Sequence, residues 1–147
     1  MALFSKEQQQ VITDGSVTLA EAEQVLAAAR QQADKLGVAY NLAVNDAGNR
    51  LVAFVRMDGA WLGSIDLAIN KAYTARAFNM STEALGKMAD PGQPLFGIHT
   101  SNDGRVVIFG GGVPLVRNGQ VIGSIGASGG TVSQDIQVAQ AGADAFK

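Results

Sequence analysis

The spacing of apolar residues in the first third of the chain predicts one helix followed by two strands. Between Thr18 and Gly37, apolar residues recur every three or four positions, and Thr18 begins a capping-box motif. A helix is therefore predicted over this stretch, ending at the glycine. Residues 38–45 and 50–57 alternate apolar with smaller or polar side chains on either side of a short turn. This pattern predicts a hairpin of two strands.

The middle of the chain predicts two helices and then a long loop. Ser64 is placed to cap a helix over 64–78, and the small apolar residues along one face would let this helix approach a sheet closely. The next suitable cap, Ser81, begins a shorter helix. The loop that follows runs from Asp90 to Gly104. Loops of this length in compact domains usually have a function.

The last third of the chain predicts three strands and a final helix. The strands are expected over 105–110, 113–116 and 120–128, and an Asn-Gly pair forms the turn between the last two. Thr131 is placed to cap the final helix. The resulting order is αββααβββα, without regular alternation of strands and helices. It favours an α+β fold in which helices pack on one mainly antiparallel sheet, in a single domain over 1–147.

The composition indicates which kinds of partner the chain is expected to bind. Hydrophobic residues make up 47% of the 147 residues and charged residues 16%, below the usual charged share of about 25%. We therefore expect part of the surface to form contacts between copies of the chain, giving a homo-oligomer. The net charge of −2 argues against nucleic acid as a partner. We find no signal peptide and no apolar stretch that could span a membrane, so we expect a cytoplasmic protein without a membrane partner.

His99 is the only imidazole in the chain, which limits the metal sites that it can form. The chain also lacks cysteine, so metal ligation by thiolate is excluded, and a single histidine argues against structural zinc. One axial ligand is enough for haem, because the porphyrin supplies the other four nitrogens. His99 is therefore the candidate metal ligand. The alternative is a solvated histidine in a loop rich in glycine, asparagine and serine.

Four other residues, Arg56, Met57, Asp58 and Lys71, are candidates for binding a small ligand. The planar guanidinium of Arg56 suits a carboxylate, Asp58 could act as an acid or base, and Met57 could cover a flat apolar ligand. Lys71 lies among apolar residues of a predicted helix. The alternatives are a surface ion pair between Arg56 and Asp58, and a Lys71 whose stem is buried while its ammonium reaches solvent.

Two glycine-rich stretches resemble known motifs without completing them. Gly110, Gly111 and Gly112 lack the spacing of a dinucleotide fingerprint and predict a bend between two strands. Residues 126–130 match the G-x-S-x-G of esterases, but no histidine follows Ser128, which argues against a serine hydrolase. The start of the helix beyond them could still bind an anion through free backbone N–H groups.

Four segments taken together resemble the GlcG/HbpS-like haem-binding family, which includes the C-terminal domain of PduO-type proteins. They are VNDAGNRLVAFVRMDGA at 44–60, SIDLAINKAYTA at 64–75, FGGGVPL at 109–115 and VIGSIGASGGTVSQD at 121–135. The resemblance implies a three-layer α/β/α arrangement around a five-stranded, mainly antiparallel sheet. It also implies assembly into homo-oligomers.

The resemblance further implies binding of haem or a related tetrapyrrole, with a corrinoid as the second possibility, and a role accessory to glycolate, glycerol or propanediol catabolism. Arg56, Met57, Asp58, Lys71 and Gly110 to Gly112 fall within the shared motifs and are the candidates to line the pocket. His99 lies outside them and is a candidate ligand on its chemistry alone. We expect a binding protein rather than an enzyme.

Two alternatives remain at this point. One is an enzyme or carrier acting on a small hydroxy acid, aldehyde or diol, with Arg56 and Lys71 holding an anion. The other is an assembly module in which the glycines serve only packing.

Overall fold

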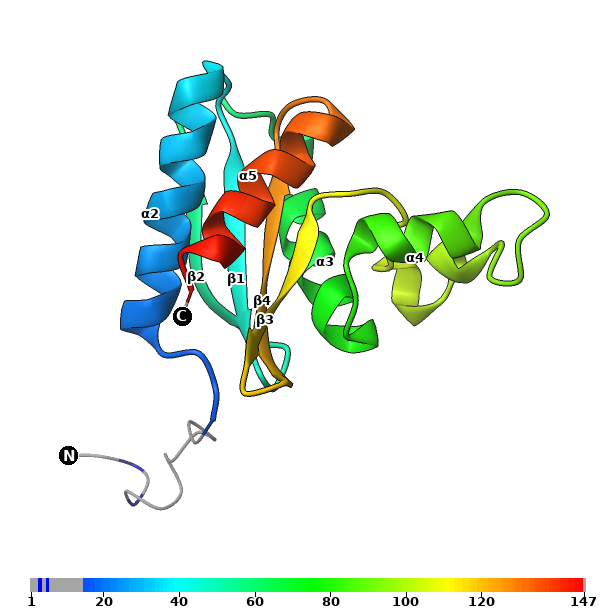
Figure 1. Ribbon diagram of the computed structural model, residues 1–147, viewed down its shortest axis with the longest axis horizontal. Coiled ribbons are helices and arrows are strands. Elements are labelled where there is room, and N and C mark those ends of the chain that lie inside the picture. Colours follow the sequence, from blue (N-terminus) through cyan, green and yellow to red (C-terminus); the bar gives the residue numbers. More distant parts are fainter. Residues whose placement is uncertain (1–2, 4, 6–14, 147) are drawn as a thin grey trace.

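The computed structural model describes residues 3, 5 and 15–146, and it has an α+β fold (Figure 1). The helices are α2 (Leu19–Leu36), α3 (Gly63–Phe78), α4 (Thr82–Ala89) and α5 (Val132–Asp144), with two short 3-10 turns at Ile98–Thr100 and Asn102–Gly104. The strands are β1 (Asn41–Asp46), β2 (Leu51–Arg56), β3 (Gly112–Arg117) and β4 (Gln120–Ser128). They form one antiparallel sheet in the order β2-β1-β4-β3. The predicted fold class and the antiparallel sheet are therefore confirmed.

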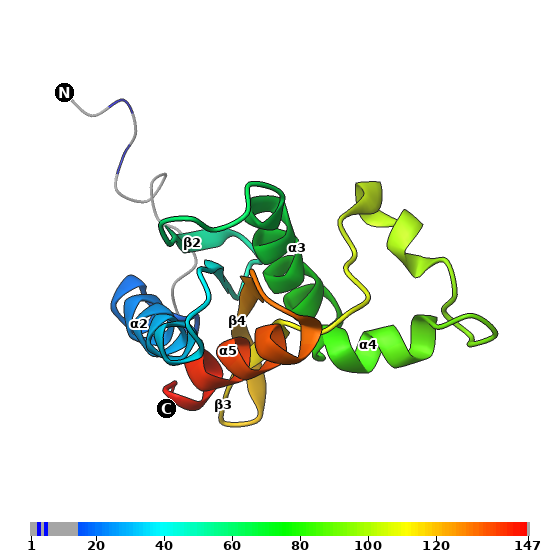
Figure 2. The same cartoon turned by 90° about the horizontal axis from the view of Figure 1, so that it is seen from above.

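Helices cover both faces of this sheet, and β1 shows how its residues divide between them. Leu42 and Val44 belong to the larger apolar cluster, together with residues of α2 and α5. Ala43 points to the opposite face, where it packs with Ala68 and Ala72 of α3. Figures 1 and 2 show α2 and α5 together on one side of the sheet and α3 on the other. The period-two alternation of a strand accounts for this division.

Close packing of α3 on the sheet depends on small residues on both sides. A Cβ atom added to Gly126 of β4 would lie 1.9 Å from the carbonyl oxygen of Ala68 and 2.6 Å from the backbone nitrogen of Ala72. The Ser124 hydroxyl also donates to the carbonyl of Ala72 at 2.6 Å. The glycine in the G-x-S-x-G stretch thus lets helix backbone lie against strand backbone.

Most predicted helix ends are confirmed, with one error. Thr18 and Thr131 each cap their helix within a complete capping box, and Gly37 ends α2 in the left-handed conformation. Ser81 caps α4 as expected. Ser64 does not cap α3, because that helix begins one residue earlier without a side-chain cap, and Ser64 is buried in its first turn.

The prediction of a strand at 105–110 is wrong, and the described part of the sheet has four strands rather than five. Pairing with β4 begins only beyond this segment, where the Gly111 carbonyl accepts the Ala127 N–H at 2.8 Å, and the side chains of two threonines hold the backbone on either side of Gly111. The Val107 N–H donates to the Thr74 hydroxyl at 3.0 Å, and the Gly112 N–H donates to the Thr82 hydroxyl at 2.9 Å. Val106 and Val107 are buried although they are not in a strand, so their apolar pattern reflects burial in the core.

The helix α4 and the long segment after it extend away from the sheet as an arm, visible in both views (Figures 1 and 2). We use the word arm for residues 82–104. It carries both 3-10 turns and His99. Within the described residues, no helix has the length and apolar character needed to cross a membrane.

Candidate functional site

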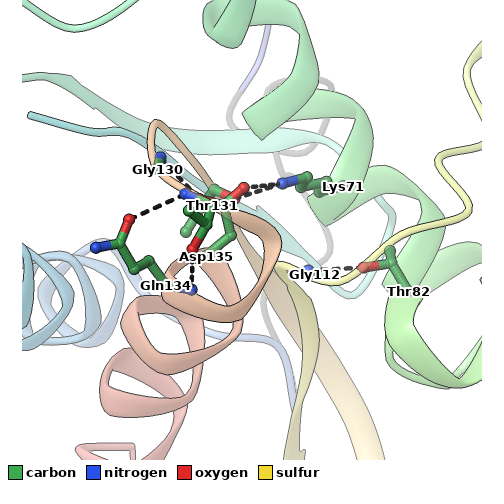
Figure 3. A network of polar contacts seen from close by, with 8 residues as sticks. Lys71, Thr82, Gly112, Gly130, Thr131, Gln134 and Asp135 are labelled. Carbon is green, nitrogen blue, oxygen red and sulfur yellow. Dashed lines mark hydrogen bonds and ion pairs between the residues drawn. The ribbon is translucent and has the colours of Figure 1, made fainter. Parts of the chain in front are cut away.

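Lys71 of α3 is completely buried, and its ammonium group is held by two oxygen atoms. Its Nζ donates to Asp135 Oδ2 at 2.7 Å and to the Ala127 carbonyl at 3.0 Å, as Figure 3 shows for the carboxylate. The side chain of Asp135 is itself 4% exposed. The interpretation in which the Lys71 ammonium reaches solvent is therefore wrong. The two oxygen atoms are the partners that a buried charge needs.

Burial and the neighbouring carboxylate shift the pKa of Lys71 in opposite directions. Burial lowers the pKa of Lys71, and the hydrogen bond and negative charge of Asp135 oppose that shift. The phenol of Tyr40 lies on the other side of the carboxylate, and burial together with Asp135 raises its pKa. No hydrogen bond of ordinary geometry joins the buried Tyr40 hydroxyl to any described residue. We call Lys71, Asp135 and Tyr40 the Lys71 cluster; it holds one ion pair beside a hydroxyl that has no well-formed hydrogen bond.

The start of α5 does not offer the anion site that its sequence suggested. The Gly130 N–H donates to Asp135 Oδ1 at 3.0 Å, and the Thr131 N–H donates to Gln134 Oε1 at 3.0 Å. The Gln134 N–H in turn donates to the Thr131 hydroxyl. Figure 3 shows these side chains folded back over the helix end. The chain's own oxygen atoms thus occupy the N–H groups near Gly130 and Thr131 that were expected to bind an anion.

The three consecutive glycines lie against the Lys71 cluster. A Cβ atom on Gly111 would lie 2.7 Å from Lys71 Nζ and 2.6 Å from the Ala127 carbonyl oxygen, and Gly111 has a φ of 124°. A Cβ atom on Gly112 would lie 2.4 Å from the Lys71 carbonyl oxygen, and one on Gly110 would overlap Ile136. These glycines therefore permit close packing, and they form a bend that leads into β3 rather than one between two strands.

His99 lines an open groove of about 280 Å³ between α3 and the segment that follows the arm. The other lining residues are mostly apolar: Leu67, Asn70, Gly104, Val106, Val107, Ile108 and Phe109. His99 itself is exposed, in the first 3-10 turn. The ring of Phe109 also lies 4.9 Å from Lys71 Nζ, measured to the ring centroid. Phe109 thus lines the groove together with His99 and also contacts the Lys71 ammonium.

Arg56, Met57 and Asp58 line a different hollow, of about 420 Å³, together with Val55 and Arg30. None of these residues lines the His99 groove, and Lys71 does not line the hollow. The prediction that Arg56 and Lys71 grip one anion therefore fails. No ion pair joins Arg56 to Asp58 in the described part of the chain. The structure instead places Arg30 of α2 beside Arg56.

Several residues of these sites were not singled out from the sequence. Phe109 and Thr74 lie within segments that carry the family resemblance, but nothing marked them as site residues, and Arg30 and Thr82 lie outside those segments. The position of Asp135 could have been noticed from the sequence, because acidic residues are favoured in the first turn of a helix. Over the described residues, no three histidine, cysteine, aspartate or glutamate side chains gather as a metal site. Any metal bound through His99 would thus need most of its ligands from elsewhere.

The fold and the groove can now be compared with known proteins. The chain matches the family model described as "Haem degrading protein HbpS-like" over residues 17–144. It therefore belongs to the HbpS-like family, and the resemblance drawn from the four sequence segments is confirmed.

Particular relatives share most of their length with this chain. It is 40% identical to the "Uncharacterized 15.0 kDa protein in dhaT-dhaS intergenic region" of Citrobacter freundii, covering 94% of this chain and 95% of that protein. The crystal structure of Klebsiella pneumoniae protein ORFY superposes with a TM-score of 0.87 at 41% identity, covering 99% and 97% of the two chains. A structure described as the PduOC:Heme complex superposes with a TM-score of 0.86 at 37% identity, covering 89% and 95%.

Proposed function

We propose that this chain binds haem or a related tetrapyrrole in the groove beside His99. The observation that carries the proposal is a lone imidazole in a lining made mostly of apolar side chains. His99 would hold the iron, and Leu67, Ile108 and Phe109 would give the apolar surroundings that a porphyrin needs. Bound haem would supply an iron that can take a further ligand or change oxidation state. The related PduOC protein, whose structure is a haem complex, supports the same ligand class.

We propose that a second copy of the chain completes this site. The groove measures about 280 Å³, just below the roughly 300–1,000 Å³ of pockets that enclose drug-sized ligands. A single chain would therefore cover one face of a flat ligand and leave the other to solvent. Exposed Phe96 and Leu95 lie on the same arm as His99 and give a second copy an apolar surface to contact.

Titration with haemin tests the proposal. We expect a shifted Soret band that saturates at a fixed stoichiometry, and an altered spectrum in His99→Ala. Thr100→Ala is the matched control, because Thr100 lies in the same exposed 3-10 turn and does not line the groove. An unchanged free-haemin spectrum would exclude haem binding, and a His99→Ala spectrum like the wild type would exclude His99 as the ligand. A parallel titration with a corrinoid separates the two tetrapyrrole classes.

The hollow beside Arg56 favours a second candidate function, binding of a small hydroxy acid by an enzyme or carrier. Arg30 and Arg56 place two guanidinium groups on one hollow, and guanidinium groups bind carboxylates with paired hydrogen bonds. Small hydroxycarboxylates should then raise the melting temperature, and Arg30→Ala or Arg56→Ala should remove the effect. Arg50→Ala is the control, since Arg50 is exposed and outside the hollow. Equal melting temperatures with and without these acids would rule this function out.

We propose a cytoplasmic role accessory to the breakdown of glycolate, glycerol or propanediol. The support is the resemblance to proteins linked with these pathways. A strain without the gene should grow more slowly than its parent on one of these carbon sources and equally well on glucose. Equal growth on all of them would contradict the accessory role.

A further inference from the structure

The wall of the His99 groove is built from residues 106–111, which reach the sheet at their last residue, where the Gly111 carbonyl accepts the Ala127 N–H of β4 at 2.8 Å. Residues 106–111 form no strand, although Val106 and Val107 are buried. The Thr74 hydroxyl accepts the Val107 N–H at 3.0 Å, which fixes one end of the segment on α3. Gly112 at its other end is fixed by Thr82. Phe109, near the middle, remains 39% exposed and has no backbone partner in a sheet to hold it.

Lys71 is the group that contacts the face of this ring. Its ammonium has three donors, and two of them bind Asp135 Oδ2 and the Ala127 carbonyl. The ammonium lies 4.9 Å from the centroid of the Phe109 ring, within the distance of about 6 Å at which a cation is attracted to an aromatic face. The attraction is strong here because the ammonium is removed from water.

Neighbouring elements leave the ammonium little freedom to move. Asp135 is fixed in turn by the Gly130 N–H at the start of α5. On another side, the absence of a side chain at Gly111 brings backbone within reach of Lys71 Nζ. Figure 3 shows Lys71 of α3 extended toward this end of α5. The ring of Phe109 therefore rests on a charge whose position is set by α3, β4 and α5 together.

We infer that the Lys71 and Asp135 pair positions Phe109 as the wall of the groove and thereby sets the affinity of the groove for a flat ligand. Lys71 is a positioning residue in this account, since its ammonium is buried behind the ring and does not line the groove. Without the charge, the exposed ring loses its attachment and the wall loses its fixed position. The inference rests on the proposed function for its ligand, and on the structure alone for the position of the ring.

The ligand-free test is amide hydrogen exchange in residues 105–112. Phe109→Leu keeps an apolar side chain but removes the aromatic face, while Phe109→Tyr keeps the face. We expect exchange in this segment to become about tenfold faster in Phe109→Leu and in Lys71→Met, and to stay near the wild-type rate in Phe109→Tyr. Lys87→Met is the control for loss of a lysine, because Lys87 is exposed on α4.

Binding of haemin gives the second readout. Lys71→Met should weaken binding by about tenfold and Phe109→Leu by at least as much, and the double variant should bind no more weakly than Phe109→Leu alone, because Lys71 acts only through the ring. Additive losses, or wild-type exchange and affinity in Phe109→Leu, would overturn the inference even if Lys71→Met fails to fold. If the wild type itself binds no haemin, the proposed function fails, and the exchange experiment still decides the position of the ring.

Discussion

At the scale of single residues, the buried carboxylate of Asp135 links several elements of the fold. Asp135 accepts hydrogen bonds from the Lys71 ammonium and from the Gly130 N–H, and it lies beside the phenol of Tyr40. Breaking one half of a buried ion pair costs about 3–5 kcal/mol, because the remaining charge is left without a partner. The same carboxylate thus ties α3 to α5, and it adds to the effect of burial in raising the pKa of Tyr40.

The hydroxyl of Tyr40 gives a prediction about stability and pH. Because this buried oxygen has no partner of good geometry, Tyr40→Phe should leave the free energy of unfolding at pH 7 unchanged or raise it by about 1 kcal/mol. The folded state raises the pKa of Tyr40, so above pH 10 the unfolded state loses this proton while the folded state keeps it. Above pH 10, Tyr40 should therefore lower the free energy of unfolding of the wild type by about 1.4 kcal/mol for each pH unit. Tyr40→Phe lacks this proton and should not show the decrease.

Urea unfolding between pH 9 and pH 11 measures this difference. The gap between Tyr40→Phe and the wild type should widen as the pH rises. Tyr73→Phe is the control, because Tyr73 is only partly buried and its hydroxyl accepts hydrogen bonds from Asn102 and Arg105. A Tyr40→Phe variant that loses more than about 1 kcal/mol at pH 7 would show that the hydroxyl does form a hydrogen bond.

At the scale of elements, the sequence predicts what depends on neighbours along the chain and misses what depends on distant partners. The capping boxes at Thr18 and Thr131 and the ending of α2 at Gly37 are local, and the structure confirms them. The apolar run at 105–110 is as hydrophobic as a strand, but the hydroxyl of Thr74 on a distant helix, and not a neighbouring strand, accepts the Val107 N–H. The same limit explains the site: Lys71 and Asp135 are 64 residues apart, and no local pattern links them.

The role of Thr82 gives a prediction at this scale. Thr82→Val keeps the shape of the side chain but removes the acceptor for the buried Gly112 N–H. We expect a loss of about 1–3 kcal/mol in the free energy of unfolding, the usual cost of a buried donor left unsatisfied. Thr100→Val is the control, because the Thr100 hydroxyl bonds only an exposed carbonyl of its own turn. Equal stability of Thr82→Val and the wild type would mean that this hydrogen bond does not hold the segment.

At the scale of the whole molecule, the three most exposed large apolar side chains within residues 15–146 lie at two places. Trp61 and Leu62 are 72% and 74% exposed just before α3, and Phe96 on the arm is 63% exposed. Contacts between proteins favour such side chains, and tryptophan in particular. Together with the low charge of the chain, these surfaces support the proposed assembly into a homo-oligomer.

Sedimentation velocity tests which of these surfaces joins the copies. We expect the wild type to sediment faster than a 15.2 kDa monomer, and Phe96→Ser and Leu62→Ser each to shift the protein toward the monomer. The physical reason is that burying a large apolar side chain contributes about 1.5–3 kcal/mol, enough to change an association constant by tenfold or more. Leu19→Ser is the control, since Leu19 is 55% exposed on α2, away from both places. A wild type that sediments as a monomer at the concentration of the haemin titration would contradict the assembly. A monomer that still saturates with haemin would show that one copy of the groove is sufficient.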